Sequence, residues 1–173
     1  DGMKKNRGVA GKFFDALSSR GINILAIAQG SSERSISTVV NGADGDLAVK
    51  AAHLFFFNTA QPIEVFAFGA GTIGGALIDQ IRDQQEKLRA QHIDIKVVAI
   101  GTIDGMIMDG NGLDLTNWRE ESKKATKKAN VDEILQFVRE TKPLNPIFVD
   151  CTASYDLPER YLDILAAGMH IAT

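Results

Sequence analysis

The sequence predicts an α+β unit followed by an α/β unit with a parallel sheet. Three observations support this. The chain has 173 residues, of which 45% are hydrophobic, which is enough to bury a core in one or two domains. A short polar segment, 58–62, separates two halves with different patterns. In the second half, strand-length and helix-length apolar stretches alternate, which is typical of parallel βαβ units.

The first half, residues 1–58, has the order helix, strand, strand, helix, which indicates an α+β sandwich. Apolar residues at helical spacing predict the first helix, and Gly21 would end it. Short β-branched or alternating stretches predict the strands. The predicted helices cover 7–20 and 43–57, and the predicted strands cover 22–28 and 35–40.

The second half, residues 62–173, begins at Pro62, which has no amide N–H and therefore marks a plausible boundary. Residues 103–129 show no clear period, because glycines interrupt their few apolar residues. The remaining segments alternate in type. The predicted strands cover 63–68, 95–100, 146–150 and a last one from 169, and the predicted helices cover 72–91, 131–142 and 158–167.

Composition and charge exclude several classes of function. The net charge of −3 provides no basic field for nucleic acid. No apolar run approaches the roughly 20 residues that a membrane span needs. The single cysteine, Cys151, cannot form an internal disulfide, which favours a reducing, cytoplasmic location. The three histidines are scattered without metal-ligand spacing. We therefore expect no nucleic-acid or membrane partner and no metal.

The strongest motif is Gly69-Ala70-Gly71-Thr72-Ile73-Gly74, between a predicted strand and a predicted helix. This is the context that a dinucleotide-binding GxGxxG requires. Gly69 would allow the tight turn, Gly71 would let a pyrophosphate approach, and Gly74 would let helix and strand pack closely. The free N–H groups at the helix start would face the phosphates. The motif favours a Rossmann-type NAD(P) site over a purely structural turn.

The end of the next strand leaves the choice between NAD and NADP open. NAD-specific folds place an acid there for the ribose hydroxyl. Here Ile100, Gly101 and Thr102 carry none, and Asp104 comes slightly late. A 2′-phosphate would meet no built-in repulsion, although no arginine stands beside this strand end in the sequence to hold it. We expect NADP or NAD, with NADP favoured.

Two further polar segments are candidate sites. Thr152 and Ser154 follow a predicted strand and could donate to a ribose or a nicotinamide amide, or Ser154 could simply cap the next helix. Cys151 beside them has no nearby histidine in the sequence and is expected to be an inert thiol. The polar segment 29–35 could bind a small polar ligand, but an ordinary solvated connection is the better interpretation. The basic run 123–128 is expected to be solvated.

Together these segments resemble the bifunctional aspartokinase–homoserine dehydrogenases, particularly the threonine-regulated type. The first half resembles an ACT domain through Arg20-Gly21-Ile22-Asn23-Ile24 and the glutamine–serine segment after Ile27. The second resembles the start of a homoserine dehydrogenase, through the glycine motif, Val149-Asp150-Cys151-Thr152-Ala153-Ser154 and the final Gly168-Met169-His170-Ile171-Ala172-Thr173. The resemblance implies a partial ACT-like domain over 1–58 and a partial Rossmann domain over 62–173.

The resemblance also implies roles for individual residues. Gln29 and Asn23 would contact a threonine effector. The family interconverts aspartate semialdehyde and homoserine with NAD(P)H, while a separate kinase domain phosphorylates aspartate. The residues implied to contact the cofactor are Gly69, Gly71, Thr72, Ile73, Gly74, Ala99, Thr102, Thr152, Ala153 and Ser154.

The sequence stops before the family's catalytic lysine and substrate domain, so we expect this chain alone to turn over neither substrate and to supply no catalytic residue. We also expect a homo-oligomer, because an ACT sheet lacking its first strand would expose an edge. One alternative is a non-enzymatic module that senses an amino acid and a nucleotide. Another is a different ACT-linked dehydrogenase, although there the ACT domain usually comes last.

Overall fold

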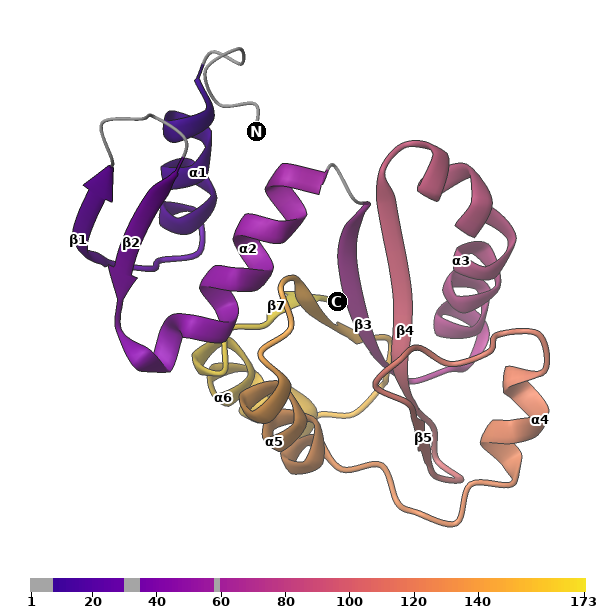
Figure 1. Ribbon diagram of the computed structural model, residues 1–173. Coiled ribbons are helices and arrows are strands. Elements are labelled where there is room, and N and C mark those ends of the chain that lie inside the picture. The colour runs from indigo at the N-terminus through magenta and orange to yellow at the C-terminus, as the bar shows by residue number, and fades with distance from the viewer. Residues whose placement is uncertain (1–7, 30–34, 58–59) are drawn as a thin grey trace. The chain divides into compact units, whose positions relative to one another are not determined.

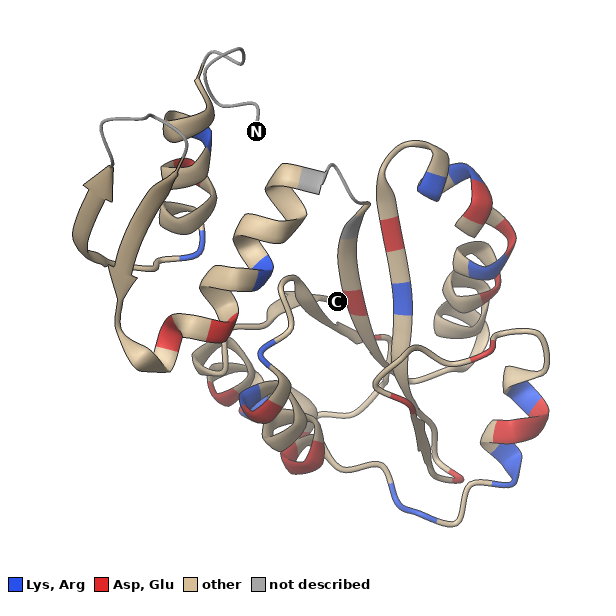
Figure 2. Ribbon diagram, viewed as in Figure 1, with Lys and Arg blue, Asp and Glu red and all other residues tan. Residues whose placement is uncertain are grey.

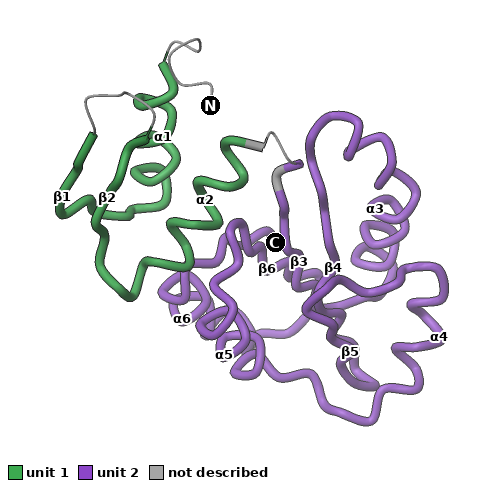
Figure 3. The backbone as a smooth tube through the Cα atoms, in the orientation of Figure 1, with its two compact units in different colours: residues 1–59 green, residues 60–173 purple. Residues whose placement is uncertain are grey.

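The computed structural model describes residues 8–29, 35–57 and 60–173. The chain divides into two compact units, Asp1–Thr59 and Ala60–Thr173 (Figure 3). In the described residues, none of the helices combines the length and the apolar character that crossing a membrane would require.

The first unit pairs two helices with a two-stranded antiparallel sheet (Figure 1). Leu17 and Ile22 are buried, and the rings of Phe13 and Phe56 lie 5.9 Å apart. The expected second helix starts as a 3₁₀ turn, because the Asn41 side chain accepts a hydrogen bond from the Ala43 N–H at 3.1 Å. The elements are α1 (Val9–Ser18), β1 (Ile24–Gln29), β2 (Ile36–Val40), η1 (Gly42–Asp44) and α2 (Gly45–Phe57).

The second unit is built on a five-stranded sheet with the order β5-β4-β3-β6-β7. β3, β4, β6 and β7 run parallel, which confirms the predicted parallel sheet, and β5 is an antiparallel edge strand. The strands are β3 (Gln61–Phe68), β4 (Ile93–Gly101), β5 (Met106–Met108), β6 (Pro146–Asp150) and β7 (His170–Ala172), and the helices are α3 (Thr72–Ala90), α4 (Trp118–Lys123), α5 (Val131–Thr141), η2 (Leu157–Arg160) and α6 (Tyr161–Ala166).

Helices cover both faces of this sheet (Figure 1). On one face, Ile134 of α5 and Ile164 of α6 pack with Phe66 and Phe148 of the strands. On the other, α3 and α4 pack their buried residues against Val65, Ala67 and Val97. Successive β3 residues therefore enter opposite layers, as the two-residue period of a strand requires. A strand segment buried on both faces is apolar, which explains the continuous apolar run Val65–Phe68 at the end of β3.

The order of the strands creates a switch point. From β3 the chain passes through α3 to β4 on one side, then returns to β6 on the other side of β3. In open parallel sheets, ligands bind beyond the carboxyl ends of the strands at such a point. The end of β3 is Phe68, directly before the glycine motif.

Candidate functional site

The carboxyl ends of β3, β4 and β6 meet beside the glycine motif. The Gly69 N–H donates to the Gly101 carbonyl at 2.9 Å, and the Cys151 N–H donates to the Phe68 carbonyl at 2.8 Å. The loops after these three strands are therefore neighbours, although the residues lie far apart in the sequence.

The three glycines of the motif differ in whether the packing of the protein itself excludes a side chain at their positions. Gly69 has φ of +84°, and a Cβ there would lie 2.5 Å from the Cys151 carbonyl carbon. A Cβ at Gly74 would lie 2.2 Å from the Gly69 carbonyl oxygen. Both are required by the fold itself. A Cβ at Gly71 would instead have nothing within 4 Å, so the protein's own packing does not explain this glycine.

The space beside Gly71 lies at the start of α3, a helix of 19 residues. Its first turn closes with the Gly75 N–H donating to the Gly71 carbonyl at 2.8 Å. Thr72 and Ile73 are exposed there. The N–H groups of a helix start lack partners within the helix and carry partial positive charge, so this end is suited to an anionic group.

A cavity of about 670 Å³, here called the main cavity, extends along the three strand ends. This volume falls in the usual range for small-molecule sites. Most of its surface is apolar, with a few polar groups from the β6 loop. It is lined by Phe68, Gly69, Gly71, Gly101, Thr102, Ile103, Ala129, Val131, Cys151, Thr152, Ala153, Ser154, Asp156, Leu157 and Arg160.

Asp150 organises the β6 side of the main cavity. One of its carboxylate oxygens accepts the Thr152 N–H at 2.8 Å and the Thr152 hydroxyl at 2.7 Å. The other accepts the Tyr161 hydroxyl at 2.7 Å. This hydrogen bond, together with burial, raises the pKa of Tyr161 to about 12. Only 9% of Asp150 is exposed, so its hydrogen bonds replace the water that a carboxylate needs.

Both hydroxyls of this loop shape its backbone as well as lining the cavity. The Thr152 oxygen accepts the Ser154 N–H at 3.2 Å. The Ser154 oxygen accepts the N–H groups of Asp156 at 3.2 Å and Leu157 at 3.4 Å, so Ser154 orders the backbone that leads into η2, whose N-cap is Asp156. Ser154 also lines the main cavity.

The Cys151 thiol is half-buried. Burial raises its pKa, and the nearby Asp150 carboxylate raises it further. A raised pKa leaves little thiolate at neutral pH, which agrees with the expectation of an inert thiol.

A second cavity of about 360 Å³, here called the side cavity, adjoins the glycine motif on the α4 side. It shares Gly69, Gly71, Thr102 and Ile103 with the main cavity. Ile103 is wholly exposed where the two cavities meet. The residues lining the side cavity are Gly69, Ala70, Gly71, Thr102, Ile103, Asp104, Trp118, Arg119, Ser122 and Lys123.

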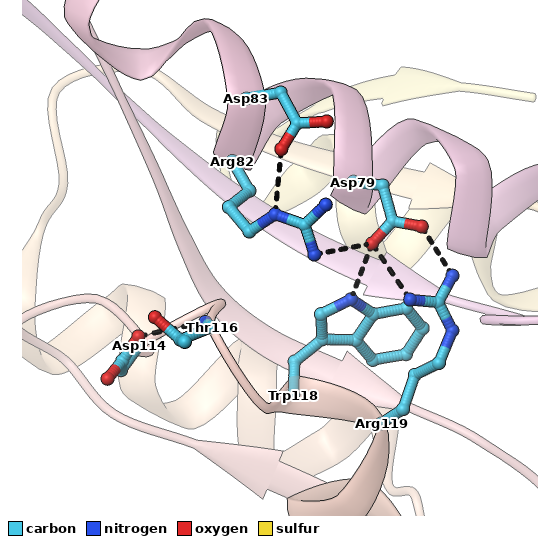
Figure 4. Close-up of polar contacts among 7 residues, drawn as sticks. All are labelled: Asp79, Arg82, Asp83, Asp114, Thr116, Trp118 and Arg119. Atoms are coloured by element: carbon cyan, nitrogen blue, oxygen red, sulfur yellow. Dashed lines mark hydrogen bonds and ion pairs between the residues drawn. The ribbon is translucent and has the colours of Figure 1, made fainter.

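Asp79 of α3 holds α4 beside this cavity (Figure 4). Its carboxylate accepts two hydrogen bonds from Arg119, at 2.9 and 2.5 Å, and one from the Trp118 indole at 3.1 Å. Arg82 donates to the same carboxylate at 3.1 Å. The bonds from Arg119 and Trp118 lower the pKa of Asp79 to about 2.

This arrangement corrects one expectation from the sequence. No arginine was expected beside the end of the second strand, but the fold brings Arg119 into the cavity that Thr102 and Asp104 also line. The contact with Asp79 spans 40 residues, so local sequence gives no signal of it. Trp118 is buried in the core, and it also forms part of the cavity wall.

Two expected cofactor residues take local structural roles. The Thr102 hydroxyl accepts the N–H groups of Asp104 and Gly105, both at 3.2 Å, so it closes the turn after β4 while Thr102 lines both cavities. Ala99 is fully buried within β4 and lines neither cavity.

The two expected threonine contacts lie at opposite ends of β1. Asn23 precedes the strand and Gln29 ends it, and both are exposed. Six residues of strand span about 20 Å, so one threonine molecule cannot touch both in the same copy of the chain. Residues 30–34 of the polar segment after Gln29 lie outside the described residues.

Comparison with known proteins identifies both units. Residues 1–56 match the ACT domain family, and residues 69–173 match the family described as homoserine dehydrogenase, NAD binding domain. The chain is 42% identical over 173 residues to the bifunctional aspartokinase/homoserine dehydrogenase of Haemophilus influenzae, covering 100% of this chain and 21% of that protein. These matches confirm the resemblance predicted from the sequence.

A plant relative gives the same result. The chain is 40% identical over 173 residues to the chloroplastic bifunctional aspartokinase/homoserine dehydrogenase 1 of Arabidopsis thaliana, covering 99% of this chain and 19% of that protein. The chain thus spans about a fifth of the length of the curated relatives it matches. Among solved structures, a Candida auris protein of unknown function has a TM-score of 0.53 at 25% identity, over 65% of this chain and 30% of that one.

Proposed function

Because the chain belongs to the homoserine dehydrogenase family, through its NAD-binding domain, we propose that the Ala60–Thr173 unit binds a nicotinamide dinucleotide for the interconversion of L-aspartate 4-semialdehyde and L-homoserine. The observation that carries the proposal is the open space beside Gly71, at the start of α3 and at the edge of the main cavity. Packing requires Gly69 and Gly74, whereas only an approaching ligand requires Gly71.

The residues of this chain would bind and orient the cofactor. The first N–H groups of α3 would hold the pyrophosphate, and the absence of a side chain at Gly71 would let it approach. Thr152, Ala153 and Ser154 would line the nicotinamide end, since Asp150 fixes the backbone of their loop. When bound, the cofactor supplies or accepts the hydride. NADP is the preferred form in this proposal, since no acid stands at Ile100, Gly101 or Thr102.

The proposal also covers the activity of a bifunctional protein that contains this chain, like the relatives it matches. There, an aspartate kinase and the remaining homoserine dehydrogenase segments would supply the catalytic groups, and the present chain alone would turn over neither substrate. The ACT unit would transmit feedback from threonine, with Gln29 as the candidate contact in a homo-oligomer. A reducing, cytoplasmic setting suits the single free thiol, Cys151.

Thermal denaturation with NADPH, NADH and threonine in separate titrations tests the proposal. A dinucleotide at about 100 times its Kd should add roughly 2.7 kcal/mol to the stability. Gly71→Ala should melt close to the wild type without ligand, because its Cβ meets no atom, but should reduce the shift. Gly45→Ala is the matched control, since its Cβ is equally free and Gly45 lies in the first unit. No shift of the wild type with either dinucleotide would refute the proposal.

A further inference from the structure

The Tyr161 side chain is linked to the main cavity without lining it. Tyr161 begins α6, packs against the hydrophobic core and lies outside the lining of both cavities. Its hydroxyl donates to one carboxylate oxygen of Asp150, and the other oxygen accepts both the N–H and the hydroxyl of Thr152. Asp150 therefore connects a core residue to a residue that lines the main cavity.

The buried carboxylate of Asp150 is stabilised by neutral donors. Its hydrogen bonds within the described residues come from Thr152 and Tyr161, neither of which is basic. Figure 2 shows the lysines and arginines of the second unit on its helices and connecting segments, apart from Lys96 in β4. A buried charge that only neutral groups stabilise depends on each of them. Tyr161 therefore holds the carboxylate in the orientation that accepts the Thr152 hydroxyl.

This orientation decides what the Thr152 hydroxyl can offer to a ligand. A hydroxyl has one hydrogen and two lone pairs. The hydrogen of Thr152 is donated to Asp150, and one lone pair accepts the Ser154 N–H. The second lone pair remains, so Thr152 can accept a hydrogen bond from a ligand but has no hydrogen left to donate.

The Ser154 hydroxyl has the opposite polarity. Its oxygen accepts the N–H groups of Asp156 and Leu157, which occupies both lone pairs, and its hydrogen has no acceptor among the described residues. The main cavity therefore presents an acceptor at Thr152 and a donor at Ser154, two residues apart in one loop. A primary carboxamide, which has an NH₂ donor and a carbonyl acceptor, matches this pair, whereas a carboxylate can only accept.

We propose that Tyr161 is a positioning residue for the redox end of the cofactor: through Asp150 it keeps Thr152 an acceptor, so that the β6 loop favours a carboxamide over a carboxylate on the ring. This inference rests on the proposed function, because it needs a nicotinamide dinucleotide in the main cavity. Without the Tyr161 hydroxyl, one oxygen of Asp150 has no donor, the carboxylate turns towards water, and the Thr152 hydrogen is released.

Isothermal titration of the whole chain tests this role with three ligands. They are the more tightly bound of NADP⁺ and NAD⁺, its analogue with nicotinate in place of nicotinamide, and the corresponding ADP-ribose fragment without a ring. Tyr161→Phe should weaken dinucleotide binding about fivefold, the usual effect of losing one hydrogen bond, and should leave the fragment within about twofold. Its preference for nicotinamide over nicotinate should fall at least as much. Tyr155→Phe is the matched control, since Tyr155 is exposed and lines neither cavity.

Variants of Thr152 show whether Tyr161 acts through this residue. Thr152→Val, which has no hydroxyl, should lose dinucleotide affinity by a similar factor, and Thr152→Ser, which keeps the hydroxyl, should retain it. The double variant Tyr161→Phe/Thr152→Val should bind the dinucleotide no more weakly than Thr152→Val alone, because two changes that remove the same contact are not additive.

The possible failures separate this role from the proposed function. If Tyr161→Phe leaves dinucleotide binding unchanged, weakens the fragment equally, or adds its full loss to that of Thr152→Val, Tyr161 supports only the fold. The positioning role is then wrong, and the proposed function stands. If neither dinucleotide binds the wild type, the proposed function fails and the positioning role fails with it.

Discussion

The hydrogen bond from Tyr161 to Asp150 offers a measurable test of how the β6 loop is held. Tyr161→Phe removes the hydroxyl 2.7 Å from a carboxylate oxygen and leaves the ring packed on the core. Because only 9% of Asp150 is exposed, water cannot readily replace the lost donor. A hydrogen bond to a charged group contributes about 1.5–3 kcal/mol, so we expect a loss near 2 kcal/mol.

Urea unfolding measures this loss, with the fluorescence of the single tryptophan, Trp118, as the signal from the core of the second unit. With a slope of about 2 kcal/mol per molar urea, the midpoint should fall by about 1 M. The other tyrosine, Tyr155, is the matched control: it is 94% exposed, so Tyr155→Phe should change the free energy of unfolding by less than about 0.5 kcal/mol. Equal losses in the two variants would refute the reasoning.

The same hydrogen bond has a signature at high pH. Asp150 raises the pKa of Tyr161 from 10.0 to about 12, so the folded state holds this proton more tightly than the unfolded state. The contribution of this hydrogen bond to the free energy of unfolding is therefore complete below pH 10, and it is lost as the pH rises towards 12. The difference in stability between the wild type and Tyr161→Phe should therefore narrow over this interval, and a constant difference would contradict the assignment.

Three other predictions concern the groups around the two cavities. Arg119 lowers the pKa of Asp79 from 3.8 to about 2, so stability present above pH 3.8 should fall towards pH 2, and Asp79→Asn should flatten this acid limb in pH-dependent melts. Gly74→Ala should cost at least about 3 kcal/mol in urea unfolding, because its Cβ would lie 2.2 Å from the Gly69 carbonyl oxygen; a loss under 1 kcal/mol would show that the turn yields. Alkylation of Cys151 by iodoacetamide at pH 7 should be slower than that of free cysteine, because burial raises its pKa.

Long elements were predictable because their patterns repeat. The helix period set α3 and α5 to within a residue of their predicted ends, and β6 matched its prediction. The segment 103–129 was not predictable, because β5 has three residues and α4 has six, too few to show a period. The predicted helix over 158–167 divides into η2 and α6, with Pro158 in the 3₁₀ turn.

The candidate site also has one part that the sequence predicts and another that it does not. The glycine motif and the β6 loop are contiguous in sequence and were found from it, whereas the side cavity depends on contacts 39 and 40 residues apart. Asp79 lies in α3, four residues after Gly75. No pattern in the sequence around it indicates that its side chain will bind Trp118 and Arg119 of α4. Gly75 lies beside this contact, since a Cβ there would be 3.4 Å from an Arg119 terminal nitrogen, which is an ordinary van der Waals distance.

Since Asp79 both anchors α4 and orients Arg119, stability and cofactor preference should be coupled at this residue. Asp79→Asn keeps one acceptor oxygen but cannot accept two charge-assisted bonds from the guanidinium. Arg119 would then lose its fixed orientation, and the variant should lose acid-sensitive stability and part of the discrimination between NADPH and NADH together. If Asp79→Asn changed stability but not the ratio of affinities, α4 would be a structural support only.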